Sequence, residues 1–185
     1  MKRLLLAFFL CSAFTLHGNE KTDYSNIDVA WTVSWNRFYH SGTHLFYDYI
    51  SSYEKGKELS HLPTQQEVSR QYPNPCGYGT GMEDCAILTG TMLGTLVDRY
   101  EQTGDEQMKN FASLLLEGLK LCSLIPGFSG FVARGVCTED GKSFYYNSSR
   151  DQYTHCVHGV WKYYNSSLSN DSGRKIARSI LTDIA

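Results

Sequence analysis

Two pairs of helical patterns in the second half of the chain limit its fold more than any other feature. The first pair covers about 80–124 and the second about 149–184. In each pair the leading segment is apolar on almost every side, while the following segment carries one apolar stripe. An apolar helix needs neighbours all around it, whereas a striped helix needs them on one side. We therefore predict an all-α fold in which inner and outer helices repeat as hairpins.

Polar motifs mark the expected start of each of these helices. Thr80–Glu83, Thr103–Glu106 and Ser149–Gln152 have the spacing of a capping box, in which the first and fourth side chains bond each other's backbone N–H groups. Asn170 precedes the last apolar stripe and is a favoured N-cap residue. The four motifs predict where the helices begin.

The rest of the chain is less regular. Aromatic residues recur every three or four positions over about 24–54, which predicts one helix or two short ones broken near Ser41–Gly42. The stretch 55–79 contains three prolines and predicts a long irregular connection that can carry function. In the glycine-rich stretch before residue 149, the runs "GFVARGV" and "SFYYN" predict a short β-hairpin.

The N-terminus has the layout of a secretory signal peptide, with Lys2 and Arg3 followed by an apolar run. We expect residues 1–18 to be a signal peptide and residues 19–185 to be one helical domain of an exported protein, secreted or periplasmic. No later run is long enough to cross a membrane. Because two hairpins cannot enclose two apolar helices, we expect this domain to be incomplete.

Charge and cysteine content exclude several classes of function. Without Lys2 and Arg3, 15 basic residues (17 less 2) face 19 acidic ones and form no basic block, which argues against nucleic acid as a partner. Five cysteines follow the expected signal, with no C-x-x-C spacing. A bridge such as Cys76–Cys137 is possible in an oxidising compartment, but we favour small buried thiols for most of them. We expect no cofactor and no metal, because His155 and His158 lack a third ligand.

Asp151 is the most suggestive titratable residue of the stretch "NSSRDQYTHCVHGVW". A carboxylate in the first turn of a helix is stabilised by the helix dipole, so Asp151 has a purely structural interpretation of equal weight. At 100° per residue, Asp151, His155 and His158 share one broad face of the expected helix. Burying three such groups without partners would cost on the order of 1 to 3 kcal/mol each, which favours a functional face.

The apolar inner helices, the "YEQTGD" turn at 100–105 and the glycine- and aromatic-rich loops resemble the six-hairpin toroids of carbohydrate-active enzymes. The resemblance covers about residues 80–185 and is closest to the unsaturated glucuronyl hydrolases. It implies an (α/α)6 toroid in which the amino ends of the inner helices line one open face. It also implies two aspartates on that face, in the positions of Asp84 and Asp151, although Asp84 lies four residues after its expected cap and Asp151 only two.

On this basis the first hypothesis is a glycoside hydrolase acting on oligosaccharides or polysaccharides, including those that contain uronic acids. Such an enzyme needs one ionised and one protonated carboxyl. Asp151 suits the ionised role, and Glu83 or Asp84 is the candidate proton donor. Arg150 or Arg134 would meet an acidic sugar. The glucuronyl hydrolases instead protonate the double bond of an unsaturated uronic acid, and that chemistry also needs two acids.

Two alternatives stay open. A polysaccharide lyase would abstract the proton beside a uronate carboxylate with Tyr153, His155 or His158 as the base and Arg134 as the neutralising cation. A noncatalytic glycan-binding protein or an inactive fragment is the third possibility. Among the aromatic residues we expect Tyr78, Tyr145 and Tyr146 to contact sugar, and Trp35 and Trp161 to belong to the core.

Overall fold

A computed structural model describes residues 21–185, so the expected signal peptide at 1–18 lies outside the described residues. Within that range the chain forms six helices and two short strands. The first helix, α1, spans Lys21–Arg37 and leads into the strands β1 (Tyr39–His40) and β2 (Leu45–Phe46). The short helix α2 (Gln65–Ser69) lies in the long connection that follows. The mainly helical character predicted from the sequence is confirmed.

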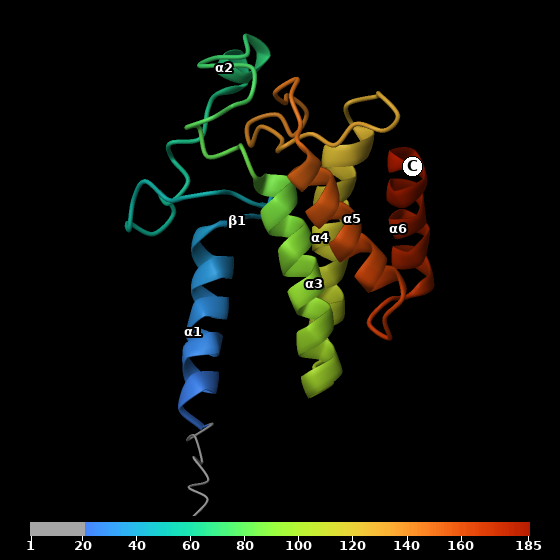
Figure 1. The fold of residues 1–185 in the computed structure, drawn as a ribbon. Helices are drawn as coiled ribbons and strands as arrows, with labels where there is room; N and C mark the ends of the chain where they lie inside the picture. The colour runs from blue at the N-terminus through green and yellow to red at the C-terminus, as the bar shows by residue number, and fades with distance from the viewer. Residues whose placement is uncertain (1–20) are drawn as a thin grey trace, which may run out of the picture.

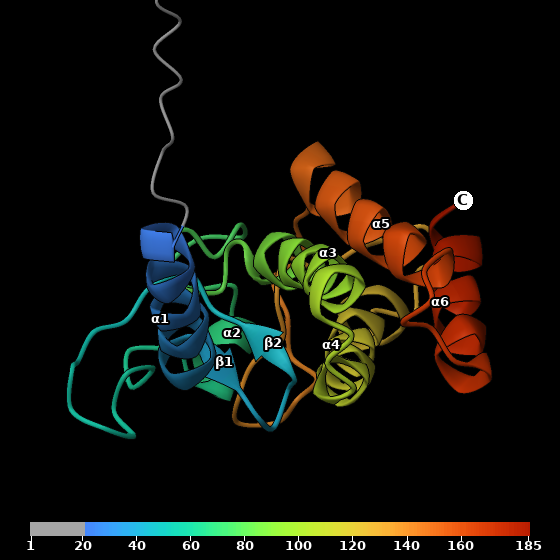
Figure 2. The same cartoon turned by 90° about the horizontal axis from the view of Figure 1, so that it is seen from below.

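Four longer helices make up the second half of the chain. They are α3 (Cys85–Thr103), α4 (Gln107–Leu124), α5 (Arg150–Tyr164) and α6 (Asp171–Ile184). The two predicted helix pairs are therefore confirmed, with the N-cap of α3 at Asp84, four residues after the expected Thr80. α3 packs most closely on α5, α4 packs on α3 and α6, and α6 packs on α5. Figures 1 and 2 show the result as two layers, with α3 and α5 in one and α4 and α6 in the other.

The leading helices α3 and α5 run in the same direction, with their amino ends at the same end of the molecule (Figure 1). They meet through Gly90 and Gly159, where the two backbones are in contact. Leucines on α3 and α4, including Leu93, Leu96, Leu115, Leu116 and Leu119, form the centre of the buried core. This packing fixes the amino ends of α3 and α5 beside each other.

The first third of the chain differs from the prediction of one or two helices over 24–54. The helix ends at Arg37, and the chain then forms an antiparallel hairpin in which Tyr39 pairs with Phe46. Ser41 and Gly42 lie in its turn, which is closed by a hydrogen bond from His44 N to His40 O of 2.8 Å. The aromatic spacing misled because the consecutive residues Leu45, Phe46 and Tyr47 are all buried at and just after a short strand, and not on one face of a helix.

The second expected hairpin, from "GFVARGV" and "SFYYN", does not form as paired strands. One backbone hydrogen bond, from Cys137 N to Ser143 O at 2.8 Å, joins the residue after the first run to the start of the second. Val132, Ala133 and Val136 are buried, but their segment is held by single contacts to several elements, such as the bond from Ala133 N to Cys122 O of 2.8 Å. The prediction failed because these apolar residues fill the core from an irregular loop.

The leading helices are also less enclosed than their composition indicated. Thr91, Thr95 and Asp98 of α3 are exposed, and so are Thr154, His158 and Trp161 of α5. The expectation that Trp161 belongs to the core is therefore wrong, whereas Trp35 packs against the core as expected. In the part of the chain that the structure describes, no helix combines the length and apolar character needed to span a bilayer.

Candidate functional site

The loop before α3 is held by Glu83 rather than by the expected capping box. The Glu83 carboxylate accepts hydrogen bonds from Gly79 N at 3.0 Å and Gly81 N at 2.8 Å, while the Thr80 hydroxyl donates to Gly77 O at 2.6 Å. Gly79 and Gly81 both have positive φ, which turns their N–H groups toward the carboxylate. The helix begins at Cys85, with Asp84 as its N-cap residue. Glu83 thus organises the loop before α3 by accepting from two backbone N–H groups, a structural role that the sequence did not predict.

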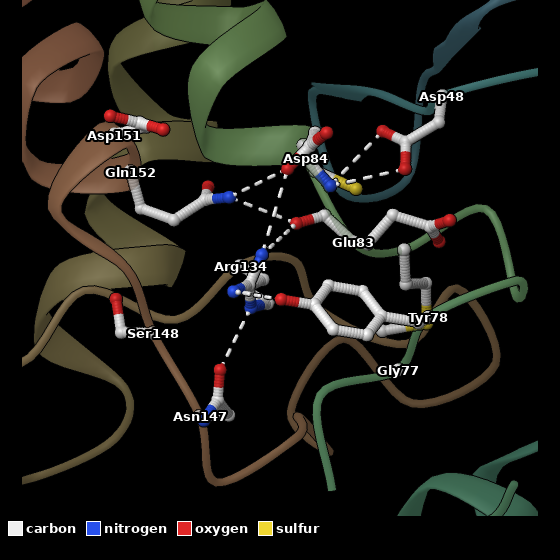
Figure 3. Close-up of polar contacts among 12 residues, drawn as sticks. Asp48, Gly77, Tyr78, Glu83, Asp84, Arg134, Asn147, Ser148, Asp151 and Gln152 are labelled. Carbon is white, nitrogen blue, oxygen red and sulfur yellow. Dashed lines mark hydrogen bonds and ion pairs between the residues drawn. The ribbon is translucent and has the colours of Figure 1, made fainter. Parts of the chain in front are cut away.

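Asp48 completes the acidic cluster, which we define as Asp48, Glu83 and Asp84. It lies two residues after β2, and both of its carboxyl oxygens accept from Asp84 N at 3.1 Å (Figure 3). Burial, followed by the negative charges of Glu83 and Asp84, raises the pKa of Asp48 to about 8. Like charges and desolvation both disfavour ionisation of a carboxyl group. Asp48 is therefore mainly protonated at neutral pH and is the proton-bearing acid of the cluster.

Arg134 lies beneath the cluster and is 4% exposed. Its Nη1 donates to Glu83 O at 3.1 Å, its Nε to Asn147 Oδ1 at 3.1 Å and its Nη2 to the Tyr78 hydroxyl at 3.2 Å. Nη1 also lies 3.6 Å from Asp84 Oδ1. All three nitrogens thus serve internal contacts. The expectation that Arg134 meets an acidic sugar, or neutralises a uronate for a lyase, is wrong for this geometry.

Gln152 connects the start of α5 to the acidic cluster. Ser149 is the N-cap residue of α5, but it makes no side-chain cap bond, so the expected capping box with Gln152 is absent. The Gln152 amide nitrogen instead donates to Asp84 Oδ1 and to Glu83 O, both at 2.9 Å (Figure 3). The side chain is fully buried between α5 and the start of α3. It thereby ties Asp84 to the neighbouring helix.

Asp151 lies at the same end of the helix pair as Asp84, as Figure 3 shows. Its side chain is 64% exposed and its carboxylate is 3.8 Å from Nε of Arg150, which is almost fully exposed. The Asp84 side chain is 47% exposed, so both carboxyl groups are open to solvent. The expectation that these two aspartates meet at one face is consistent with this placement. The premise that Asp151, His155 and His158 are buried is wrong, because Asp151 and His158 are exposed and His155 is only half-buried.

The remaining predicted residues divide into buried and exposed groups. Tyr145 is 1% exposed and its hydroxyl donates to Tyr72 O at 2.6 Å, so a ligand cannot reach its ring as expected. Tyr153 is half-buried, with its hydroxyl 3.5 Å from Val132 N. Tyr78 and Tyr146 are well exposed. The guanidinium of Arg134 packs against one face of the Tyr78 ring at 5.0 Å and holds it beside the acidic cluster.

Two grooves flank α3 below the acidic cluster. One, of about 280 Å³, reaches Asp48 and lies between α1, β2 and α3; its lining includes Phe38, Phe46, Leu88 and Met92. The other, of about 390 Å³, lies between α3 and α5 and includes His155, His158, Asp98 and Lys162. Thr91 and Thr95 line both grooves. The exposed face of α3 therefore separates two grooves, and the site at its amino end adjoins the first of them.

Among residues 21–185, no group of three or more His, Cys, Asp or Glu side chains is arranged to hold a metal ion. His155 Nδ1 is 2.9 Å from Asp151 O, which ties that ring to its own helix. Comparison with protein-family models, with curated proteins and with solved structures finds no match to this chain.

Sequence reasoning missed Asp48 and the role of Gln152. Asp48 sits in "LFYDYI", where a lone acid after buried aromatic residues has no motif around it. Its proximity to Asp84 arises only when the hairpin packs on the start of α3, where Asp48 N donates to Gly81 O at 3.2 Å. Asp48 could have been selected from the sequence only if "LFYDYI" had been interpreted as a buried strand, because an acid directly after such a strand is unusual.

Proposed function

We propose that this protein is an exported carbohydrate-active enzyme of the glycoside hydrolase kind, and that its helices form part of an (α/α)6 toroid. The two-layer packing supports the proposal, because α3 and α5 lie side by side with α4 and α6 behind them (Figure 2). The common direction of α3 and α5 brings two amino ends to one face. In a toroid of helical hairpins that face is the open mouth where the substrate binds.

The observation that carries the proposal is the different surroundings of two neighbouring carboxyl groups, those of Asp48 and Asp84, at the start of α3. Asp48 has a pKa raised to about 8 and holds a proton at neutral pH. Asp84 is half-exposed, lies at a helix N-terminus and accepts a hydrogen bond from Gln152. Glycoside hydrolysis requires such a pair, with one carboxyl protonating the departing oxygen and the other acting as a base or nucleophile.

We assign the roles accordingly. Asp48 donates the proton to the glycosidic oxygen as the bond to the departing sugar breaks. Asp84, the more exposed of the two, activates the water or attacks the sugar carbon. Asp151, across the junction of α3 and α5, adds a second negative charge that stabilises the positively charged sugar ring in the transition state. Asp48 thus takes the proton-donor role for which the sequence offered Glu83 or Asp84, and Asp84 takes the role first expected of Asp151.

The exposed tyrosines support a saccharide as the substrate. The outer face of the Tyr78 ring is open, while its inner face and hydroxyl are fixed by Arg134. A rigid ring beside a carboxyl cluster offers a stacking surface for the flat apolar face of a sugar, and Tyr146 is a second exposed ring. Arg150, which is almost fully exposed beside Asp151, is the cation that would meet a uronate.

The test is an assay with unsaturated and saturated uronides and with neutral aryl glycosides. A glucuronyl hydrolase removes the absorbance of the unsaturated uronide, whereas a lyase creates it. We expect Asp48→Asn, Asp84→Asn and Asp151→Asn each to reduce turnover at least about a hundredfold while circular dichroism stays unchanged. Asp98→Asn, an exposed aspartate on the same α3, is the matched control and should retain activity. New absorbance would identify a lyase, and saccharide binding without turnover by the wild-type chain would refute catalysis.

A further inference from the structure

Gln152 is fully buried, yet one of its two polar atoms has no partner. Its Nε2 donates to Glu83 O and Asp84 Oδ1, while Oε1 is buried without any hydrogen bond. Both partners of Nε2 are oxygen acceptors, so rotating the amide by 180° would place Oε1 against two oxygens. Glu83 O and Asp84 Oδ1 therefore fix the orientation of the Gln152 amide, and this orientation leaves Oε1 unpaired.

An unpaired buried acceptor lowers the stability of the folded state. A methionine of similar length and volume would fill the same space without an unpaired oxygen. With methionine at position 152, Glu83 O and the Asp84 carboxyl group would still have hydrogen-bond partners. Glu83 O also accepts from Arg134 Nη1, and Asp84 is half-exposed to water. The glutamine therefore costs stability that a simple packing residue would not.

We infer that Gln152 is a positioning residue whose buried amide holds the Asp84 carboxylate in its working orientation at the mouth of the site. The inference rests on the proposed function, in which Asp84 activates the water or attacks the sugar. The amide fixes one oxygen, Oδ1, through its hydrogen bond of 2.9 Å, and Arg134 lies on the same oxygen at 3.6 Å. The other oxygen, Oδ2, is then the one directed at water or substrate.

The position of Gln152 explains how a residue of α5 serves a carboxylate of α3. Its side chain crosses the interface of the two helices at their amino ends (Figure 3). Asp151, the preceding residue, points outward to solvent on the same turn. Consecutive residues of α5 thus contribute one internal support and one exposed carboxylate to the same site.

The decisive variant is Gln152→Met in the full chain. We expect the midpoint of urea unfolding to stay the same or rise, because the unpaired oxygen is removed. We expect kcat to fall about tenfold to a hundredfold with little change in KM, because a misplaced catalytic group slows the chemical step. Gln152→Glu should regain part of the activity at acid pH, where a protonated glutamate can donate to Asp84, and lose it as the pH rises.

A second measurement decides the inference even if no substrate is found. In a protein labelled with ¹³C at aspartate carboxyl carbons, the Asp84 signal, identified by its loss in Asp84→Asn, should shift and broaden in Gln152→Met. The signals of Asp98 and Asp171 serve as internal references. A destabilised Gln152→Met variant, an unchanged Asp84 signal, or unchanged kcat in an active enzyme would each overturn the inference. Absence of turnover in the wild-type chain would refute the proposed function alone.

Discussion

Gly159 of α5 rests directly against Gly90 of α3, so that a Cβ atom built on either glycine would overlap the backbone of the other helix. The overlap for Gly159 is with the Gly90 carbonyl, and for Gly90 with the His155 carbonyl. Contacts between backbones cannot be relieved by rotating a side chain. This contact sets the distance between the two helices whose amino ends carry Asp84 and Asp151.

Gly159→Ala should therefore destabilise the fold by about 1–3 kcal/mol, the usual range for overfilling a packed core. The measurement is the free energy of unfolding in urea. Gly94→Ala on the facing helix α3 is the control, because its Cβ would meet only side-chain atoms at 3.8 Å or more. There the better helix propensity of alanine should leave stability equal or higher. Equal losses in both variants would show that the close contact is not what limits this position.

The raised pKa of Asp48 predicts a pH dependence of stability. Its folded-state pKa of about 8 lies above the ordinary value of 3.8, so the folded chain binds more protons than the unfolded chain between these values. Stability therefore falls as the pH rises through that window and levels off above it. In Asp48→Asn this component should vanish.

Urea unfolding from about pH 4 to 9, bracketing the window between the unfolded and folded pKa values, tests this prediction. The difference between the wild-type and Asp48→Asn free energies should decline steadily across the range and become flat at its upper end. A flat difference throughout would mean that Asp48 ionises normally, and the proton-donor role proposed for it would fall with that result.

The helix pairs could be predicted from sequence because their information is local. The apolar stripe of α4 faces the core as its helical spacing predicted, and it consists of Met108, Ala112, Leu115 and Leu119. Asn170 acts as the predicted N-cap residue, because its side-chain oxygen accepts from Gly173 N at 2.7 Å. The start of α3 could not be placed in the same way. Glu83 has the spacing of a capping box, but the positive φ of Gly79 and Gly81 offers its carboxylate closer donors.

The site was predictable only in part, because its members come from three separate segments. Asp84 and Asp151 were found through their positions near helix starts. Asp48 could not be predicted as a site residue, because its raised pKa and its role depend on the β1–β2 hairpin. The aromatic spacing in that stretch had predicted a helix. Arg134 was found as a charged residue, but its burial follows from a loop whose path no local pattern determines.

Arg134 should be required for stability rather than for contact with a ligand. Arg134→Met removes three hydrogen bonds from a buried guanidinium and releases the Tyr78 ring. Because hydrogen bonds of charged groups contribute about 1.5–3 kcal/mol each, we expect a loss of at least roughly 2 kcal/mol in the free energy of unfolding. Arg150→Met, at an almost fully exposed position, is the control and should have little effect on stability. A stable Arg134→Met variant with impaired substrate affinity would restore the ligand-binding role.

The cysteines provide a last test of the core, because the five described thiols differ sharply in access. Four of them are buried, namely Cys85, Cys122, Cys137 and Cys156. All five described cysteines are free thiols, so the Cys76–Cys137 disulfide that the sequence left open does not form. Burial raises the pKa of the Cys156 thiol to about 12 and also raises those of Cys85, Cys122 and Cys137. Thiolates are the reactive form, so these four should resist alkylation.

In the chain from residue 19 onward, labelling with a charged maleimide under native conditions should modify Cys76 alone, and labelling in urea should modify all five thiols. Mass spectrometry of the labelled peptides identifies each site. Cys76→Ser is the control, since it should abolish the native reaction while leaving four sites in urea. Rapid native labelling of Cys122 of α4 or Cys156 of α5 would mean that the two helix layers separate in solution, and the fixed spacing of the aspartates at the amino ends of α3 and α5 would no longer hold.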